Sequence, residues 1–332
     1  MSDSKDLILA FLNDFVLGAF GRAPTSEKLD HAVRYLSTWN GTDKFFSIIQ
    51  YVLKLVIPFL EFRARLQYRY GKRKDATSSA SGPLSKLHSL IGDSRMLYRF
   101  WGLLPIYQWL TSLEHMPPPT RKLLTIERIQ GWSMLLYYPF EHLYYLRTHG
   151  ILPENINLSV PFAKNLSVKL NASKLALWST RAWAVYVLLH LFHLREDARL
   201  LRLRERALAK SKSNGDTEAE KADLAKRKSI LRNECIENLA NVPLTIHWSQ
   251  EKGLFSNDIW VGVFGLIAAL ASFANGWQAT ALRPPPPVNP TPPPAPSNID
   301  VNLDIPAGVP STSEVKGSDS ESDEKMGSIV IV

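Results

Sequence analysis

The sequence predicts an all-α integral membrane protein, and three observations support this fold class. Apolar residues recur at helical spacing between clear breakers, with no convincing alternating strand pattern. From Ile259 to Leu282 no side chain is charged, and a helix of this length reaches ~36 Å, enough to cross a ~30 Å hydrocarbon core. The third observation is that the segment 85–109 combines a wide apolar face with a thin basic strip. We expect amphipathic helices, one clear and one doubtful membrane span, and a disordered C-terminal tail.

The first part of the chain is expected to form three helices. The first covers about residues 4–20, the second starts at Pro24 and ends at Asn40-Gly41, and the third starts at Thr42. Pro58 is expected to kink or break the third helix, because proline removes a backbone donor and clashes with the preceding turn. The end of this helix is basic, with Arg63, Arg65, Arg69, Lys72, Arg73 and Lys74.

The segment 85–109 is the candidate membrane-interface helix. One broad arc of the helical wheel is apolar, and a narrow opposite strip holds Arg95 and Arg99, which are four residues apart and project together. We expect the apolar arc to enter the acyl boundary, the two arginines to meet anionic lipid headgroups, and Pro105 to end the inserted part. An ordinary core helix with a solvated edge is an equally good interpretation of the periodicity alone. The apolar arc consists of Leu87, Leu90, Ile91, Leu97, Tyr98, Trp101 and Leu104.

An aromatic-rich helix is expected at about 121–147, after the break at 116–120, with an interruption at Pro139. Aromatic density most often means packing. A nucleic-acid surface would need exposed rings beside a basic groove, and the basic residues lie elsewhere. Nucleic acid is therefore not an expected partner.

A long helix at 172–208 has two characters. Residues 175–194 are mostly apolar and form the doubtful span, although Arg181, His190 and His193 interrupt it. A run of arginines follows from Arg195. The next charged segment, 218–239, mixes both signs and is interpreted as a solvated surface helix.

The uncharged segment near the C-terminus carries small residues at alternating spacings of three and four, which place them in one stripe. Such a stripe lets another helix approach closely in lipid, either from this chain or from a second copy. A buried core helix of a soluble protein is the weaker alternative, because such helices rarely run this long without a charge. The stripe consists of Gly262, Gly265, Ala269, Ser272 and Gly276.

Charge and composition divide the chain at residue 282. The net charge is +8, and the tail 283–332 contains three basic and seven acidic residues, so residues 1–282 carry +12. A basic helical domain favours an anionic partner. The tail is Pro-rich and then acidic, and it lacks the apolar content to fold. A single cysteine, Cys235, excludes an internal disulfide.

No set of residues argues for catalysis or for a cofactor. His190 and His193 are three apart on a helix, but without a nearby Cys, Asp or Glu they would make a poor metal site. No strand leads into a Gly-rich phosphate loop. The sequence therefore predicts a protein that is not an enzyme and that carries no catalytic, cofactor-binding or metal-binding residues.

Three stretches together resemble the peroxisomal membrane-elongation family, peroxin eleven, and its fungal C-type branch in particular. They are GTDKFFSIIQY (Gly41–Tyr51), SRMLYRFWGLLP (Ser94–Pro105) and GVFGLIAALASFANGW (Gly262–Trp277). The resemblance covers about residues 1–282. Pro58 and Pro105 depart from the helical pattern near the first two motifs, and the acidic tail lies outside the family pattern.

The resemblance implies an integral protein of the peroxisomal membrane that elongates this membrane during peroxisome proliferation and fission. It also implies oligomers with itself and with related peroxins, contact with dynamin-type fission machinery, and delivery by the peroxisomal membrane-protein import receptor. A metabolite channel or transporter component of the same membrane is the competing function, although a pore needs several polar-lined spans.

Membrane topology stays open in the sequence. Two spans place both termini on one side, which the resemblance assigns to the cytosol. The positive-inside rule instead places the basic loop after Arg195 in the cytosol.

Overall fold

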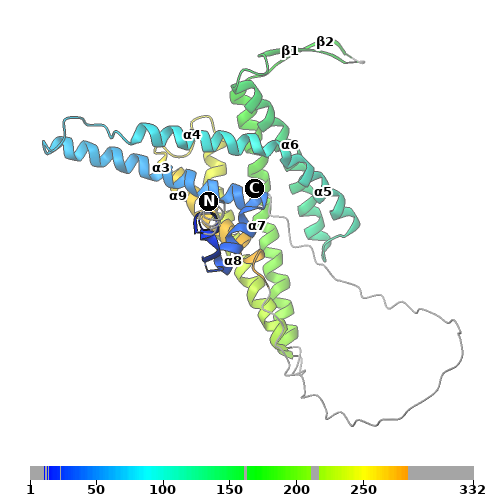
Figure 1. The fold of residues 1–332 in the computed structure, drawn as a ribbon. Coiled ribbons are helices and arrows are strands. Elements are labelled where there is room, and N and C mark those ends of the chain that lie inside the picture. Colours follow the sequence, from blue (N-terminus) through cyan, green and yellow to red (C-terminus); the bar gives the residue numbers. More distant parts are fainter. Residues whose placement is uncertain are drawn as a thin grey trace, which may run out of the picture. The chain divides into compact units, whose positions relative to one another are not determined.

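The computed structural model describes residues 11, 13, 15–22, 24–160, 163–210 and 217–282, and it confirms the all-α fold class. The described residues up to Ala281 form one compact unit (Figure 1). The predicted disordered tail, 283–332, and most of the predicted first helix lie outside the described residues. The helical elements are η1 (Leu17–Arg22), α2 (Glu27–Leu36), α3 (Trp39–Arg69), α4 (Ser81–Tyr98), η2 (Arg99–Gly102), α5 (Leu103–His115), α6 (Arg121–Thr148), α7 (Ala172–Lys210), α8 (Thr217–Trp248) and α9 (Ile259–Ala279).

Side-chain N-caps mark the starts of three helices. Ser26, Thr38 and Thr120 each accept a hydrogen bond from the backbone N–H three residues later, at the starts of α2, α3 and α6. Such caps satisfy one of the backbone donors that a helix start leaves without a partner.

Proline does not break the two helices in which an interruption was expected, and the expected kink at Pro58 stays a prediction. α3 continues through Pro58 and α6 continues through Pro139, and α8 likewise contains Pro243. A proline removes one backbone hydrogen bond, and the side-chain packing along the rest of a long helix outweighs that local loss.

A short hairpin was missed. β1 (Asn155–Val160) pairs antiparallel with β2 (Ala163–Lys169), with Ile156 opposite Val168 and a register irregularity between Leu158 and Val160. The alternating Ile156, Leu158 and Val160 were the available signal.

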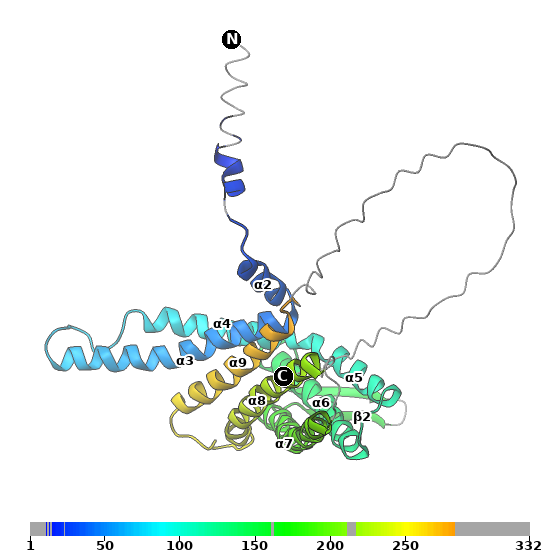
Figure 2. The same cartoon turned by 90° about the horizontal axis from the view of Figure 1, so that it is seen from below.

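The helices of the compact unit pack as neighbours in the order α4, α3, α9, α8, α7, α6 and α5. Figure 2 shows α9, α8 and α7 following one another. In Figure 1 the α3–α4 hairpin runs across the direction of α7 and α8. α4 and α5 are joined by η2, which also contacts α6 and so connects the two ends of this row.

Among the described residues, three helices are long and apolar enough to cross a membrane: α3, α7 and α9. α9 is the clear span of the sequence analysis and α7 contains the doubtful one. α3 was not recognised, because Pro58 was expected to divide it.

The interpretation of 218–239 as a solvated surface helix holds for residues 218–228 and is wrong for the rest of the segment. α8 lies between α7 and α9, and it buries Asn233 and Asn238 there. Both halves of the helix carry mixed charge, so the sequence does not show that one face of the second half is covered.

Candidate membrane-interaction surface

The predicted interface residues form the outer face of α4, η2 and the start of α5, and we call this set the outer apolar face. Six of the seven apolar residues are largely exposed, at 44–66% of their full accessibility, whereas Ile91 is 8% exposed. Tyr98 also packs edge-on against Trp39 of α3, with 5.4 Å between ring centroids. The exposed six are Leu87, Leu90, Leu97, Tyr98, Trp101 and Leu104.

The predicted single helix 85–109 is instead two helices joined by one 3-10 turn, Arg99–Gly102. Pro105 does not end a helix, because it lies in the first turn of α5, where a missing N–H has no cost. The change of direction at η2 keeps Trp101 and Leu104 exposed while it brings Arg99 against α6.

Arg95 and Arg99 do not lie on a solvated strip. Arg95 Nε donates to Asp43 Oδ1 at 2.8 Å, Nη2 donates to Oδ2 at 3.2 Å, and Nη1 donates to Gln50 Oε1 at 2.7 Å. Arg99 Nη2 lies 2.8 Å from Glu141 Oε1. The expectation that these arginines meet headgroups therefore differs from the structure, because carboxylates of α3 and α6 already neutralise them.

Small residues let this polar strip approach its neighbours closely. A Cβ at Gly92 would lie 2.5 Å from Gln50 Nε2, and one at Gly102 would lie 2.3 Å from the ring of Tyr138. The polar strip of α4 and η2 thus faces protein and the apolar arc faces outward. This is the reverse of the arrangement in a helix that covers a water-soluble core.

Tyrosine and histidine side chains of α6 complete the junction with η2. Tyr137 Oη donates to Glu141 Oε1 at 2.7 Å, and burial holds the pKa of Tyr137 well above its ordinary value. The phenol therefore stays protonated as a donor. His142 stacks on Phe100 with 4.1 Å between centroids, and burial lowers the pKa of this histidine.

The small-residue stripe of α9 packs against helices of the same chain. A Cβ at Gly265 would lie 2.2 Å from the Tyr51 ring of α3, and one at Gly276 would lie 2.5 Å from the Tyr35 ring of α2. Gly262 likewise faces Leu55 of α3, at 2.8 Å from a built Cβ. Ala269 and Ser272 are buried between them. The stripe therefore serves packing within this chain, which was one of its two predicted uses.

The histidine pair of α7 has acidic neighbours that the sequence analysis overlooked. His193 Nε2 lies 3.0 Å from Asp197 Oδ2, and Glu127 of α6 is 3.9 Å from the other ring nitrogen. Asp197 is only one helical turn further along, so it could have been found from spacing. No group of three or more such side chains in the described part of the chain is arranged to hold a metal ion.

Comparison with known proteins gives one match. A family model described as Peroxisomal biogenesis factor 11 (PEX11) matches residues 29–277. No curated protein and no solved structure matches the chain.

Proposed function

The chain belongs to the peroxisomal biogenesis factor 11 family, and from this premise we propose that it elongates the peroxisomal membrane by inserting the outer apolar face of α4, η2 and α5 into one leaflet. Membership implies a role in peroxisome biogenesis, and this family is not known as an enzyme family. The mechanism, the integral membrane location and the partners are proposals.

The observation that carries the proposal is the inverted polarity of α4. Its large apolar side chains are exposed, whereas Arg95 forms an ion pair with Asp43 inside the helical unit. In water this arrangement exposes apolar surface that lipid would cover, and transfer of each half-exposed side chain into lipid contributes about 1 kcal/mol. The six exposed residues together supply enough free energy to hold the outer apolar face in a membrane interface.

Anionic lipid is the proposed partner, but the contact differs from the one expected from the sequence. Arg95 and Arg99 have protein partners, so the basic end of α3 takes over the attraction to headgroups. This end carries mostly exposed basic residues beside exposed Phe62 and Tyr68. A basic residue near an anionic surface contributes about 1 kcal/mol.

Insertion into one leaflet expands that leaflet and favours curvature, and many linked copies would convert local curvature into elongation. Oligomers with itself and related peroxins, the import receptor and dynamin-type fission machinery are the proposed protein partners. The small-residue stripe of α9 already faces α3 and α2, so self-association requires a different surface.

The test is tubulation of anionic liposomes by the reconstituted full-length chain. Leu97→Glu combined with Trp101→Glu should abolish tubulation while circular dichroism shows unchanged helix content, because charges on this face oppose insertion. Leu203→Glu changes an equally exposed leucine of α7 and should leave tubulation intact. Full tubulation by the double variant would disprove the insertion mechanism.

A metabolite channel is the second candidate, and the inward-facing polar side chains favour it. Buried Gln130, Glu141 and Glu237 show that polar groups collect inside the helical unit. Each has its own partner, Tyr186 O for Gln130, Arg99 for Glu141 and Lys44 for Glu237, so a pore would require these contacts to separate. Flux of small anions into proteoliposomes that contain the Leu97→Glu, Trp101→Glu double variant would favour the channel.

A further inference from the structure

The second half of α8 runs between two helices that are apolar enough to span a membrane. At one end Thr180 Oγ1 of α7 donates to Trp248 O at 2.9 Å, and halfway along Asn238 Nδ2 donates to Val187 O at 3.0 Å. On the other side Asn233 Nδ2 donates to Asn275 Oδ1 of α9 at 2.9 Å. This half of α8 therefore has the same depth in the helical unit as the apolar parts of α7 and α9.

The polarity of α8 inverts along its length. In the first half Leu224 is buried and Lys226, Arg227 and Lys228 are exposed, as in a helix that meets water. In the second half the pattern is the opposite. Five of its polar residues are 1–8% exposed, whereas Ile236, Leu239 and Ile246 are 41%, 60% and 39% exposed. The buried polar residues are Asn233, Glu237, Asn238, Asn241 and Thr245.

We infer that residues 230–248 of α8 cross the membrane between α7 and α9, with Ile236, Leu239 and Ile246 in contact with lipid acyl chains. Nineteen residues of helix reach ~28 Å, close to the ~30 Å hydrocarbon thickness. This inference rests on the proposed membrane integration of the chain and not on membrane elongation.

Three of the buried polar residues of this segment have partners on neighbouring helices, as a membrane interior requires. Glu237 lies 3.6 Å from Lys44 Nζ of α3, and both side chains are less than 10% exposed. Asn233 and Asn238 bond to α9 and α7. Arg232 is exposed near the end of the segment, where a long basic side chain reaches the interface. Averaged hydropathy misses such a segment because it counts inward-facing polar residues as if they faced lipid.

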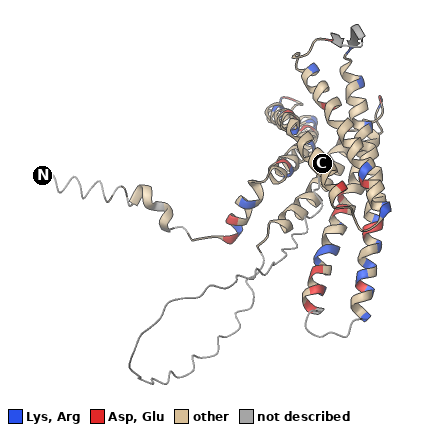
Figure 3. Cartoon of the chain, turned by 90° about the vertical axis from the view of Figure 1, so that its right-hand side faces the viewer, with Lys and Arg blue, Asp and Glu red and all other residues tan. Residues whose placement is uncertain are grey.

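With α8 as a third crossing beside α7 and α9, the segments that lie on the same side of the membrane are determined. The charged ends of α7 and α8, residues 195–210 and 217–228, form a paired stalk whose charges gather at one end in Figure 3. Gln278 at the end of α9 bonds to Ser229 at the base of this stalk, and His31 of α2 bonds to Trp277 O. The stalk, α2 and the end of α9 therefore lie at one face.

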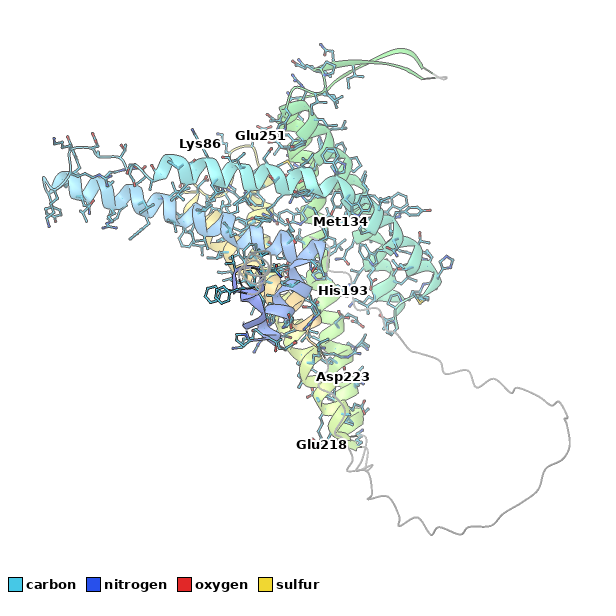
Figure 4. The ribbon with its side chains drawn as sticks, viewed as in Figure 1. Lys86, Met134, His193, Glu218, Asp223 and Glu251 are labelled. Carbon is cyan, nitrogen blue, oxygen red and sulfur yellow. The ribbon has the colours of Figure 1, made fainter. Side chains whose placement is uncertain are left out.

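The loop between α8 and α9 lies at the other face. Figure 4 shows Glu218 and Asp223 at one end of α8 and Glu251 beyond the opposite end. With two spans, the basic loop after Arg195 and the chain termini were expected on opposite sides of the membrane, in conflict with the positive-inside rule. With α8 as a third crossing, the stalk and the end of α9 emerge on the same side, and this conflict disappears.

Single cysteines test this arrangement in the full chain with Cys235→Ser as background. Sealed vesicles carrying the protein are treated with a membrane-impermeant maleimide before and after permeabilisation. Cysteines at Lys210 and Leu282 should react on the same side and a cysteine at Lys252 on the opposite side. A cysteine at Leu239 should stay unlabelled in both conditions, whereas the matched Lys226→Cys should react as Lys210→Cys does.

Two outcomes would overturn the inference in distinguishable ways. Release of the chain by alkaline carbonate would remove both membrane integration and the α8 crossing. Retention of the chain with Lys210→Cys and Lys252→Cys labelled on the same side would leave integration standing and disprove the α8 crossing alone.

Discussion

Ion pairs in the stalk and ion pairs in the inner part of the helical unit use the same side-chain chemistry in opposite settings. In the stalk Arg204 lies 3.2 Å from Glu220 and 3.1 Å from Asp223, and these side chains are 37–42% exposed. Inside, Arg95 pairs with Asp43 at 2.8 Å, and these side chains are only 14% and 11% exposed. The stalk ion pairs and the inner ion pairs therefore differ in burial and not in geometry.

The difference shows which charges specify the fold. Water screens the stalk pairs, and such pairs contribute about 0–1 kcal/mol each. Removal of one member of a buried pair leaves a charge without solvent or partner and typically costs about 3–5 kcal/mol. The inner pairs should therefore tolerate joint replacement but not single replacement.

The largest effect is expected from Asp43→Ala, which removes the carboxylate that pairs with Arg95 and keeps the hydrogen bond from Arg95 to Gln50. The free energy of unfolding should fall by about 3–5 kcal/mol, measured by denaturant titration of the purified chain in detergent. The double variant Arg95→Met with Asp43→Leu should recover most of this loss. Equal destabilisation of the single and the double variant would contradict the comparison.

A smaller effect is expected from Gly265→Leu, because its side chain would enter the space of the Tyr51 ring. Overpacking of this kind costs about 1–3 kcal/mol, measured in the same titration. Ile267→Leu, two residues along and 41% exposed, is the matched control and should be near neutral. Equal stability of the two variants would show that α3 and α9 do not approach this closely.

Acidification should weaken the junction at η2. Burial lowers the folded-state pKa of His142 below 6.5, so the unfolded chain binds the proton more readily. The stabilising contribution is present above pH 6.5 and is lost as the pH falls from there through the lowered pKa. His142→Gln should make the melting temperature less dependent on pH between 7 and about 5. An unchanged pH dependence in this variant would place the titrating group elsewhere.

The smallest effect is expected from Arg204→Ala in the stalk. The free energy of unfolding should change by about 0–1 kcal/mol, and the change should shrink further at high salt. Thermal melts of the variant and the natural chain at low and high ionic strength measure this difference. A loss as large as that of Asp43→Ala would mean that the stalk is not surrounded by water.

Local patterns predicted local features well. The periodicity of Leu90, Leu97 and Trp101 identified an exposed apolar face, and the spacing of Gly262 and Gly265 identified a close-packing stripe. Both features depend only on which residues share a helical face, and that information lies within a few turns of sequence.

Ion-pair partners that are far apart in the sequence could not be predicted from it. Asp43 meets Arg95 from 52 residues away, and Glu141 meets Arg99 from 42 residues away. No local pattern shows that these charges are neutralised. The inward face of α8 was missed for the same reason, because Asn233 and Glu237 look solvated until α9 and α3 are placed beside them.

The buried pair between Lys44 and Glu237 has a consequence for how the chain reaches its membrane. Each of the two helices alone would carry a charged side chain of this pair into hydrocarbon, and their contact lowers that cost. We expect α3 and α8 to enter the bilayer together, after the intervening chain has been synthesised, and not one after another as they leave the ribosome. A chain that lacks residues 1–80 should then leave Leu239→Cys open to aqueous maleimide. A factor that delivers the newly synthesised protein to the membrane must shield several helices from water at the same time.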